Sequence, residues 1–210
     1  MKQLNLEDGA RAIVIVAHPD DETIWLGGTM MKYPRAQWTV FSLCRANDAD
    51  RAPKFQKVCQ RYGAKALMAD LDDEDKLSLE QTIPIIKQLL LDNLPQTTFD
   101  YLFTHGANGE YGHERHFGVH QAVQKMLTAG QLIAQTALAF NYELTGQKTW
   151  PILITKTDSD YLLDLSPKEF QAKKKIMIDL YGFAPDGLDV AYCVNPEGFK
   201  IIEYNPNTTN

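Results

Sequence analysis

The sequence predicts a single α/β domain, residues 1–210, with a mostly parallel sheet and helices on both faces. Its 210 residues suit one domain. Hydrophobic residues at 44% and charged residues at 23% match ordinary globular chains, which excludes disordered, collagen-like and coiled-coil proteins. Short apolar runs alternate with stretches of helical character, and this alternation predicts parallel strands joined by helices.

The alternation is regular up to residue 127. Residues 11–17 (RAIVIVA) form a β-branched run without helical spacing, as expected of a buried parallel strand near the centre of a sheet. Pro34, Gly63 and Pro95 each follow an expected helix, which they end. The expected strands are 11–17, 38–43, 66–69 and 100–104, and the expected helices are 23–33, 52–62, 79–91 and 113–127.

The pattern loosens in the last third of the chain. We expect strands at 136–142 and 151–155 and a lysine-rich amphipathic helix at 167–180. Residues 192–204 are predicted to form a hairpin that turns at 195–198.

Charge and hydropathy exclude several kinds of partner. Lys and Arg number 21 against 27 Asp and Glu, and the resulting net charge of −6 opposes binding to a phosphate backbone, so we expect no nucleic-acid partner. The longest apolar run, 12–17, is far shorter than the roughly 20 residues that cross a bilayer, and no signal pattern precedes it. We therefore expect a cytoplasmic protein without a transmembrane segment.

The cysteines and the acidic run at 70–75 are expected to have no chemical role. Cys44, Cys59 and Cys193 are widely spaced and form no CxxC pair, which is typical of small buried thiols rather than disulfides or zinc ligands. The run DLDDED at 70–75 is interpreted as a solvated loop rather than a cation site.

The histidines are concentrated in two places. Four of the five lie within the sixteen residues 105–120, and the fifth, His18, directly follows the first predicted strand. Ligands bind beyond the carboxyl ends of the strands in an open α/β sheet, and His18 and His105 both stand at such ends. Two segments far apart in the sequence are therefore expected to meet on one rim of the sheet.

The first of these segments is AHPDDE, residues 17–22. Three carboxylates this close repel one another unless a cation compensates them or water solvates them, so the segment indicates a divalent metal. An imidazole and a carboxylate three residues apart, His18 and Asp21, would form a His₂Asp set with a second imidazole from elsewhere. Such a set leaves positions open for water, as catalytic zinc sites do.

The second segment is GEYGHERHFGVH, residues 109–120. It is not an HExxH motif, because Phe117 occupies the fourth position after His113. On a helix, positions 113 and 116 share a face, as do 116 and 120, so His116 can ligate while His113 or His120 supports it. We interpret His105 and His120 as hydrogen-bonded supporting or core residues rather than ligands.

The combination of AHPDDE after a first strand with a distal GEYGHxxH resembles the PIG-L/LmbE-like zinc-dependent de-N-acetylases. The resemblance extends over most of the chain, including a lysine-bearing helix at 168–175. It implies a Rossmann-like fold, one zinc ion per chain, and hydrolysis of the acetamide of an N-acetylglucosamine-type sugar or glycoconjugate. Other divalent metals and a homo-oligomer stay open. By motif position, the resemblance implies the zinc ligands His18, Asp21 and His116, the general base Asp20, and His113 as electrophile or acid.

The sequence departs from this family pattern at two places. Arg115 stands where the family usually has an aspartate that orients the first histidine of the pair. A cation beside His113 would lower its pKa unless the side chain points away, so either Glu110 or Glu114 orients the histidine or His113 acts as a neutral hydrogen-bond donor. In the second helix an arginine remains where the family has Arg-x-x-Glu, but a lysine, Lys54, replaces the glutamate.

These motifs supply the components that amide hydrolysis requires. Zinc lowers the pKa of its bound water towards about 7 and polarises the carbonyl. Asp20 would accept the proton of the water, and either Asp20 or His113 would protonate the leaving amine. The residues expected to contact the substrate are Arg51, Tyr111, Glu110 and Asn108.

Two other functions fit a site of this composition. A metal-dependent phosphoesterase uses similar carboxylate and histidine ligands. A metal-binding or sugar-binding homologue without catalysis would account for Arg115, but it would have no need for Asp20 as a carboxylate beside the metal. A nucleotide-binding Rossmann domain lacks support, because no GxGxxG follows residue 17 and the acidic residues 20–22 would repel a pyrophosphate.

Overall fold

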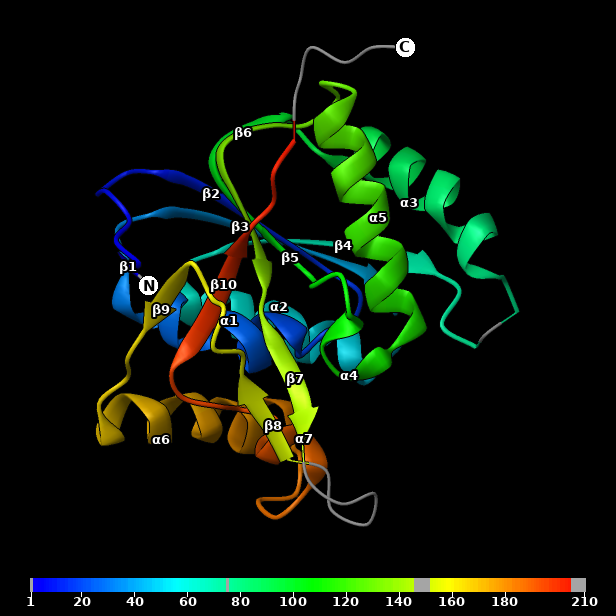
Figure 1. The fold of residues 1–210 in the computed structure, drawn as a ribbon. Coiled ribbons are helices and arrows are strands. Elements are labelled where there is room, and N and C mark those ends of the chain that lie inside the picture. The colour runs from blue at the N-terminus through cyan, green and yellow to red at the C-terminus, as the bar shows by residue number, and fades with distance from the viewer. Residues whose placement is uncertain (1, 75, 146–151, 205–210) are drawn as a thin grey trace.

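The computed structural model describes residues 2–74, 76–145 and 152–204 and confirms the predicted α/β fold. A twisted sheet crosses the molecule, with helices on both of its faces (Figure 1). The strands are β1 (Lys2–Gln3), β2 (Arg11–Val16), β3 (Gln37–Cys44), β4 (Lys65–Leu71), β5 (Thr98–Thr104), β6 (Ile133–Phe140), β7 (Tyr142–Thr145), β8 (Ile152–Thr155), β9 (Tyr161–Leu163) and β10 (Glu197–Ile201).

The helices connect the parallel strands and then cover one end of the sheet. Helices α3 and α5 pack together on one face, and α1, α2 and α6 lie on the other (Figure 1). The helices are α1 (Asp21–Lys32), α2 (Arg51–Tyr62), α3 (Leu79–Asn93), α4 (Gly109–Gly112), α5 (Glu114–Thr128), α6 (Pro167–Ile176) with a π-helical turn (Met177–Tyr181) after it, and α7 (Leu188–Ala191).

The order of the strands fixes where a site can form. The main sheet runs β1-β9-β10-β6-β5-β2-β3-β4, and the five strands from β6 to β4 are parallel to one another. The chain builds β2, β3 and β4 outward in one direction and then returns to place β5 on the other side of β2. The order therefore reverses between β2 and β5, which creates a Rossmann-like switch point where ligands bind.

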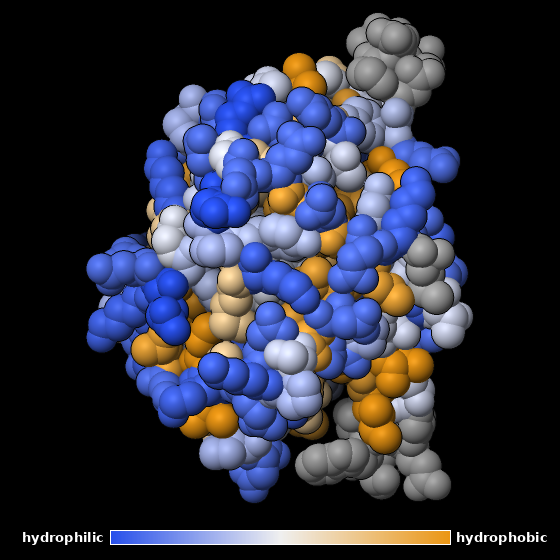
Figure 2. Space-filling model, turned by 90° about the vertical axis from the view of Figure 1, so that its left-hand side faces the viewer, coloured by the Kyte–Doolittle hydropathy of each residue, from blue (hydrophilic) through white to orange (hydrophobic). Residues whose placement is uncertain are grey.

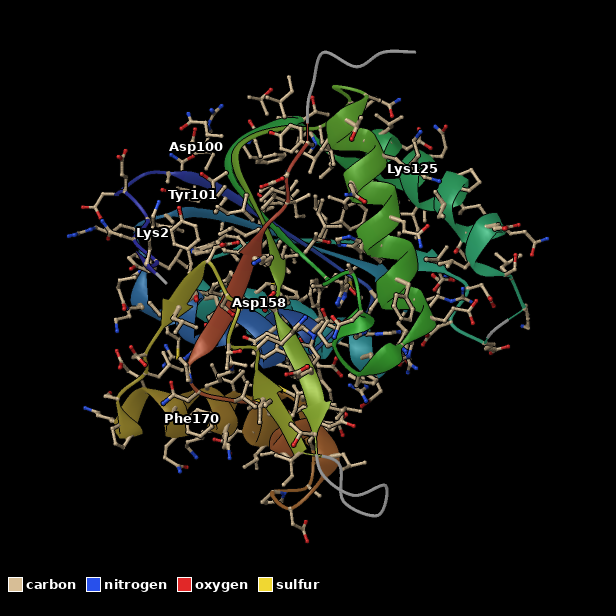
Figure 3. All side chains as sticks on the ribbon, viewed as in Figure 1. Lys2, Asp100, Tyr101, Lys125, Asp158 and Phe170 are labelled. Atoms are coloured by element: carbon tan, nitrogen blue, oxygen red, sulfur yellow. The ribbon has the colours of Figure 1, made fainter. Side chains whose placement is uncertain are left out.

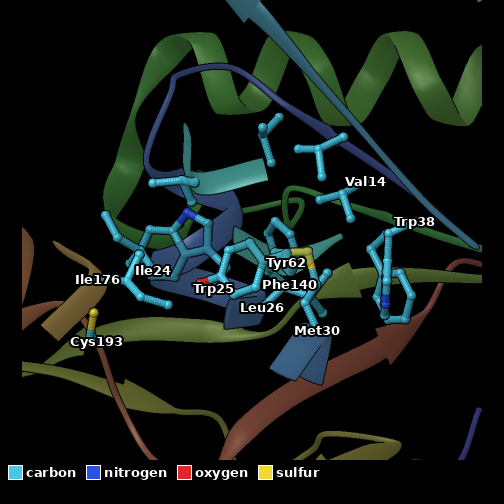
Figure 4. Packing of buried hydrophobic residues seen from close by; sticks show 14 of the residues in the cluster. Val14, Ile24, Trp25, Leu26, Met30, Trp38, Tyr62, Phe140, Ile176 and Cys193 are labelled. Carbon is cyan, nitrogen blue, oxygen red and sulfur yellow. The ribbon is translucent and has the colours of Figure 1, made fainter. Parts of the chain in front are cut away.

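Strand β2 is buried from Ala12 onward because its alternating side chains enter two separate cores. Ala12, Val14 and Val16 pack on the face that carries α1 and α2, whereas Ile13, Ile15 and Ala17 pack on the face that carries α3 and α5. Figure 4 shows part of the first core, in which large side chains such as Trp25 and Phe140 fill the space beneath the sheet. The central position predicted for this strand is confirmed.

Polar contacts hold the amino-terminal edge of the sheet together. The backbone N–H and the guanidinium of Arg11 both donate to the carboxylate of Asp100, which Figure 3 shows at the start of β5. The face of the molecule in Figure 2 is mainly hydrophilic, with apolar side chains in separate groups. None of the helices in the described ranges is long and apolar enough to span a membrane. The three cysteines are buried and free, as predicted.

The eight elements predicted before residue 127 are confirmed, with small shifts at their ends. Helix α1 begins two residues earlier than expected, because the carbonyl of Asp20 already accepts from the N–H groups of Thr23 and Ile24. The predicted strand 136–142 is divided into β6 and β7, and its first residues lie within β6. Strand β8 confirms residues 152–155 of the strand predicted at 151–155, and Pro151 lies outside the described residues.

The hairpin predicted at 192–204 is wrong. Residues Glu197–Ile201 do form a strand, but this strand, β10, pairs antiparallel with β6 and β9 and not with the residues just before it. The preceding segment contains the helical turn α7. The alternation of EGFKI is enough to predict a strand. Its partners, β9 and β6, lie about 35 and 60 positions away, and local sequence patterns do not identify partners at such distances.

A buried ion pair joins three elements, β10 and the helices α1 and α6, on the face of the sheet that carries these helices. The ammonium of Lys173 on α6 lies 2.7 Å from Oε1 of Glu197, and both side chains are fully buried. The same carboxylate accepts from the N–H groups of Gly28 and Thr29 and from the hydroxyl of Thr29 on α1. Lys173 is therefore an interior residue of the lysine-rich helix, and its burial is possible because Glu197 is fully bonded.

We expect Glu197→Ala to destabilise the protein by about 3–5 kcal/mol, because it leaves the Lys173 charge buried without a partner. Urea unfolding followed by circular dichroism measures the change. Lys175→Ala is the matched control, since Lys175 is exposed and pairs with Asp179 at the surface, a contact worth about 0.3–0.5 kcal/mol. Equal effects of the two substitutions would contradict a structural role for the buried pair.

Candidate metal centre

The site lies at the switch point between β2 and β5. His18 follows the carboxyl end of β2 and His105 follows that of β5, so the two segments meet on one rim as predicted. A cleft of about 260 Å³ opens there, and His18, Asp20, Arg45, Arg51, Tyr111 and His113 are among the residues that line it.

The turn between β2 and α1 holds Asp20 in an unusual backbone conformation. Asp20 has φ 128°, a conformation that costs an L-residue roughly 1–3 kcal/mol and persists only when its surroundings impose it. Its backbone N–H donates to Oε2 of buried Glu22, and the hydroxyls of Thr23 and Tyr181 donate to Oε1. Burial raises the pKa of Glu22 to about 7. Although Asp20 precedes α1, its side chain makes no capping hydrogen bond and faces the cleft.

Three side chains bring donor atoms together at the base of the cleft, and Asp21 does so with both carboxylate oxygens. Nδ1 of His18 lies 3.3 Å from Oδ2 of Asp21 and 3.4 Å from Nε2 of His116. The same nitrogen of His116 lies 3.5 Å from Oδ1 of Asp21. Donors around a tetrahedral zinc ion at 2.0–2.1 Å are separated by about 3.4 Å, so these distances suit such an ion without large movement.

Asp21 supplies the central charge of this group and is 3% exposed. Its carboxylate accepts from the backbone N–H of His18 and from Nε1 of Trp25. Burial alone would raise the pKa of Asp21, but the neighbouring imidazoles of His116, His105 and His18 hold it well below its usual value. The carboxylate is therefore ionised and able to bind a cation.

The ring of His18 is oriented by a residue that the sequence did not single out. Nε2 of His18 lies 2.7 Å from Oδ1 of Asp73, whose other oxygen accepts from Arg45. Burial would lower the pKa of His18, but its bonds to Asp21 and Asp73 raise it to about 10. Because Asp73 occupies Nε2, Nδ1 is the nitrogen that a cation would take, displacing its proton.

The interpretation of 70–75 as a solvated loop is therefore wrong for two of its residues. Asp73 contacts a candidate ligand, and Asp72 accepts from the guanidinium of Arg115. Asp75 lies outside the described residues. Residues 72–74 follow the carboxyl end of β4, and the strand order brings them to the same rim as the metal site. Their position after a predicted strand was the sequence signal that could have identified them.

Glu110 lies beneath the cleft and not along its wall. It is 1% exposed; Oε2 lies 2.6 Å from Nδ1 of His116 and 2.9 Å from Nδ1 of His105, and Oε1 accepts from the backbone N–H of Gly106. With both oxygens bonded inside the protein, Glu110 does not have the exposed position expected of a substrate contact.

His113 begins helix α5 at the edge of the cleft. Its Nδ1 accepts from the backbone N–H of Arg115, and burial together with the charges of His116 and His18 lowers its pKa to about 4. The ring is therefore neutral, with its proton on Nε2. The side chain of Arg115 points away, towards Asp72 and the carbonyl of Leu77. Of the alternatives that the sequence left open, His113 as a neutral hydrogen-bond donor fits best. Glu114, one of the two candidates for orienting the ring, is exposed.

Asp20 and Arg51 form a pair inside the cleft. Nη1 of Arg51 lies 2.8 Å from Oδ2 of Asp20, and the guanidinium also lies 4.5 Å from the centre of the Phe183 ring. Burial and the neighbouring charge of Asp21 raise the pKa of Asp20 well above its usual value, although His18 and Arg51 oppose this shift. Asp20 is thus a carboxylate beside the three donors that is poised to take up a proton.

The remaining predicted residues differ in their positions. Tyr111 lines the cleft and stacks on Tyr192, with 5.1 Å between ring centres. Asn108 does not reach the cleft: its amide donates to the carbonyl of Tyr142, and it borders a separate cavity of about 710 Å³. His120 bonds the carbonyl of His105 through Nδ1, in agreement with its interpretation as a supporting residue. Arg45, Tyr192 and Asp189 also line the cleft, and no sequence motif marked them.

Two solved structures share this fold. GalB, the 4-carboxy-2-hydroxymuconate hydratase from Pseudomonas putida KT2440, is 15% identical with a TM-score of 0.56, and the match covers 95% of this chain and 99% of GalB. Dbv21, the antimicrobial reagent A40926 pseudoaglycone deacetylase, is 12% identical with a TM-score of 0.57, and the match covers 83% of this chain and 82% of Dbv21. At these identities the likeness establishes the fold alone.

The family comparison concerns the segment that contains the site. Residues 13–127 match the family described as PIG-L, GlcNAc-PI de-N-acetylase. The match spans more than half of the chain, from β2 to α5, and includes AHPDDE and GEYGHERH. It confirms the resemblance found in the sequence and indicates a hydrolase that acts on N-acetyl bonds. The chain belongs to the PIG-L family of de-N-acetylases.

Proposed function

We propose that the protein is a zinc-dependent hydrolase that removes the acetyl group from an N-acetylglucosamine-type sugar. The observation that carries this proposal is the approach of His18, Asp21 and His116, whose donor atoms lie 3.3–3.5 Å apart, with an additional carboxylate, Asp20, beside them. Membership of the PIG-L family supports the de-N-acetylase reaction. The cytoplasmic location and the lack of a nucleic-acid partner remain predictions.

The donor set suits zinc among the divalent metals. His18, Asp21 and His116 offer two imidazole nitrogens and one carboxylate oxygen, a combination typical of catalytic zinc with a fourth position left for water or substrate. When bound, such a metal lowers the pKa of its water to about 7 and polarises the acetamide carbonyl.

Asp20 acts as the general base. Its Oδ2 is held by Arg51, so Oδ1 is the atom that accepts the proton of the attacking water. The backbone conformation of Asp20 keeps the side chain in the cleft and away from the helix terminus. The raised pKa of this carboxyl suits a group that holds the proton briefly and then returns it to the departing amine.

His113 stabilises the developing oxyanion. Because its Nδ1 is occupied by the N–H of Arg115, the neutral ring presents Nε2–H to the cleft. A donor in this role contributes roughly 3–4 kcal/mol to the transition state. With its pKa lowered to about 4, His113 carries no second proton near neutral pH, which leaves protonation of the amine to Asp20.

The charges of the cleft favour a neutral substrate over a phosphoester. Asp20, Asp21, Asp73 and Asp189 line the cleft, against two arginines, Arg45 and Arg51. Both arginines already contact aspartates, so they offer less attraction to a phosphate dianion. The position of Asp20 also argues against a protein that only binds metal or sugar. The hydratase GalB shares the fold, and a fold alone does not select the reaction.

We expect the zinc-loaded protein to release acetate and a free amine in equal amounts from at least one N-acetylated sugar or glycoside. The screen measures acetate by a coupled assay over N-acetylglucosamine, its glycosides and its glycolipid headgroups, and measures phosphate release from phosphoesters in parallel. A chelator should abolish acetate release and added zinc restore it. Phosphate release without acetate release would contradict the proposal.

Substitutions should separate the base from the ligands. Asp20→Asn should keep about one zinc ion per chain but lower kcat by about 10²–10⁴-fold, because it removes the proton acceptor. His18→Ala and His116→Ala should lose the metal, because each removes one of three ligands. Metal content is measured by atomic emission on dialysed protein. Equal zinc content in all three variants would contradict these assignments.

A further inference from the structure

Two buried histidines share one carboxylate oxygen below the candidate metal site. The rings of His105 and His116 stack with centres 3.7 Å apart and planes 18° apart, and both side chains are fully buried. Nδ1 of each ring points at Oε2 of Glu110, at 2.9 Å and 2.6 Å. The other carboxylate oxygen accepts from the backbone N–H of Gly106. Three donors therefore converge on Glu110, and none of them is an acceptor in this arrangement.

This convergence fixes the proton positions on both rings. A carboxylate without a proton only accepts, so Nδ1 of each histidine carries the hydrogen. In His105 the opposite nitrogen, Nε2, accepts from the backbone N–H of Ala17 at 2.9 Å. Its contact with Asp21 is longer, 3.4 Å. In His116 the opposite nitrogen has its lone pair turned towards His18 and Asp21. The two stacked rings thus have the same tautomer but different partners.

We propose that Glu110 is a positioning residue that limits the metal site to three protein ligands: it turns Nε2 of His116 towards the metal and fixes His105 as a non-ligand. The inference rests on the proposed metal site. It gives Glu110 a role that differs from the substrate contact expected from the sequence.

The restriction on His105 matters because this ring is close enough to ligate. Nε2 of His105 lies 3.4 Å from Oδ2 of Asp21, the oxygen that Nδ1 of His18 approaches at 3.3 Å, so a fourth nitrogen lies beside the candidate ligands. Four protein ligands close a zinc site and are typical of structural zinc, whereas three leave room for water and substrate. By committing His105 to the backbone of Ala17, the network keeps the site open.

The wild-type protein gives the first test. Loaded with ¹¹³Cd and labelled with ¹⁵N-histidine, it should show cadmium couplings to two ring nitrogens, Nδ1 of His18 and Nε2 of His116. His105 should show a protonated Nδ1 and no coupling. A coupling to His105, or ligation of His116 through Nδ1, would overturn the proposal. This measurement does not depend on any variant folding.

Glu110→Gln gives the second test because it changes only the hydrogen-bonding character of one side chain. In either orientation the amide NH₂ faces a donor: Gly106 N–H in one, the two Nδ1–H groups in the other. Where the NH₂ faces the two Nδ1–H groups, a histidine must change tautomer, and where it faces the N–H of Gly106, the side chain loses that bond and must shift away from it. If His116 does so, it loses its lone pair to the metal, and if His105 does so, its Nε2–H opposes the N–H of Ala17.

We expect Glu110→Gln to weaken zinc binding by about 10–100-fold, measured by competition with a fluorescent chelator. Glu114→Gln is the matched control, since Glu114 is exposed on the first turn of α5, and it should bind zinc like the wild type. Equal zinc affinity in the two variants would overturn the proposal. Wild-type protein that binds cadmium as described but releases no acetate would refute the proposed function and not this inference.

Discussion

The buried negative charge of Asp21 is the constraint on which the rest of the site depends. Its carboxylate lies within 3.5 Å of nitrogens of three histidines, His18, His105 and His116. Such a charge persists inside a protein only if cations and hydrogen bonds compensate it. In the described structure the surrounding imidazoles and N–H groups do so, and a divalent ion held by two of these imidazoles would do so more strongly.

The strand order brings these groups together from distant parts of the chain. His18 and His116 are 98 residues apart, and they meet because β2 and β5 are neighbours at the point where the strand order reverses. Further residues then orient the rings from below and beside them, Glu110 from the short helix α4 and Asp73 from the loop after β4. Each ring has one nitrogen bonded to a carboxylate and the other turned towards the centre.

The sequence predicted the parts of this arrangement that depend on local patterns. Strand β2 was identified from a short apolar run, and the meeting of His18 with the 105–120 segment followed from the positions of strand ends. What could not be predicted depends on contacts between distant residues. Nothing near Asp73 indicates that its partner is His18, and nothing near Glu197 indicates Lys173 or the strands beside β10. The sequence likewise did not show that Asn108 bonds the carbonyl of Tyr142 and stays outside the cleft, because this depends on the path of its loop.

X-ray diffraction from crystals of the zinc-loaded protein, recorded above and below the zinc absorption edge, locates the metal itself. We expect one anomalous peak per chain on this rim, about 2.0–2.2 Å from Nδ1 of His18, the carboxylate of Asp21 and Nε2 of His116. A peak located instead among the other acidic residues, such as Asp48 and Asp70, or no peak on the rim at full zinc occupancy, would contradict this expectation.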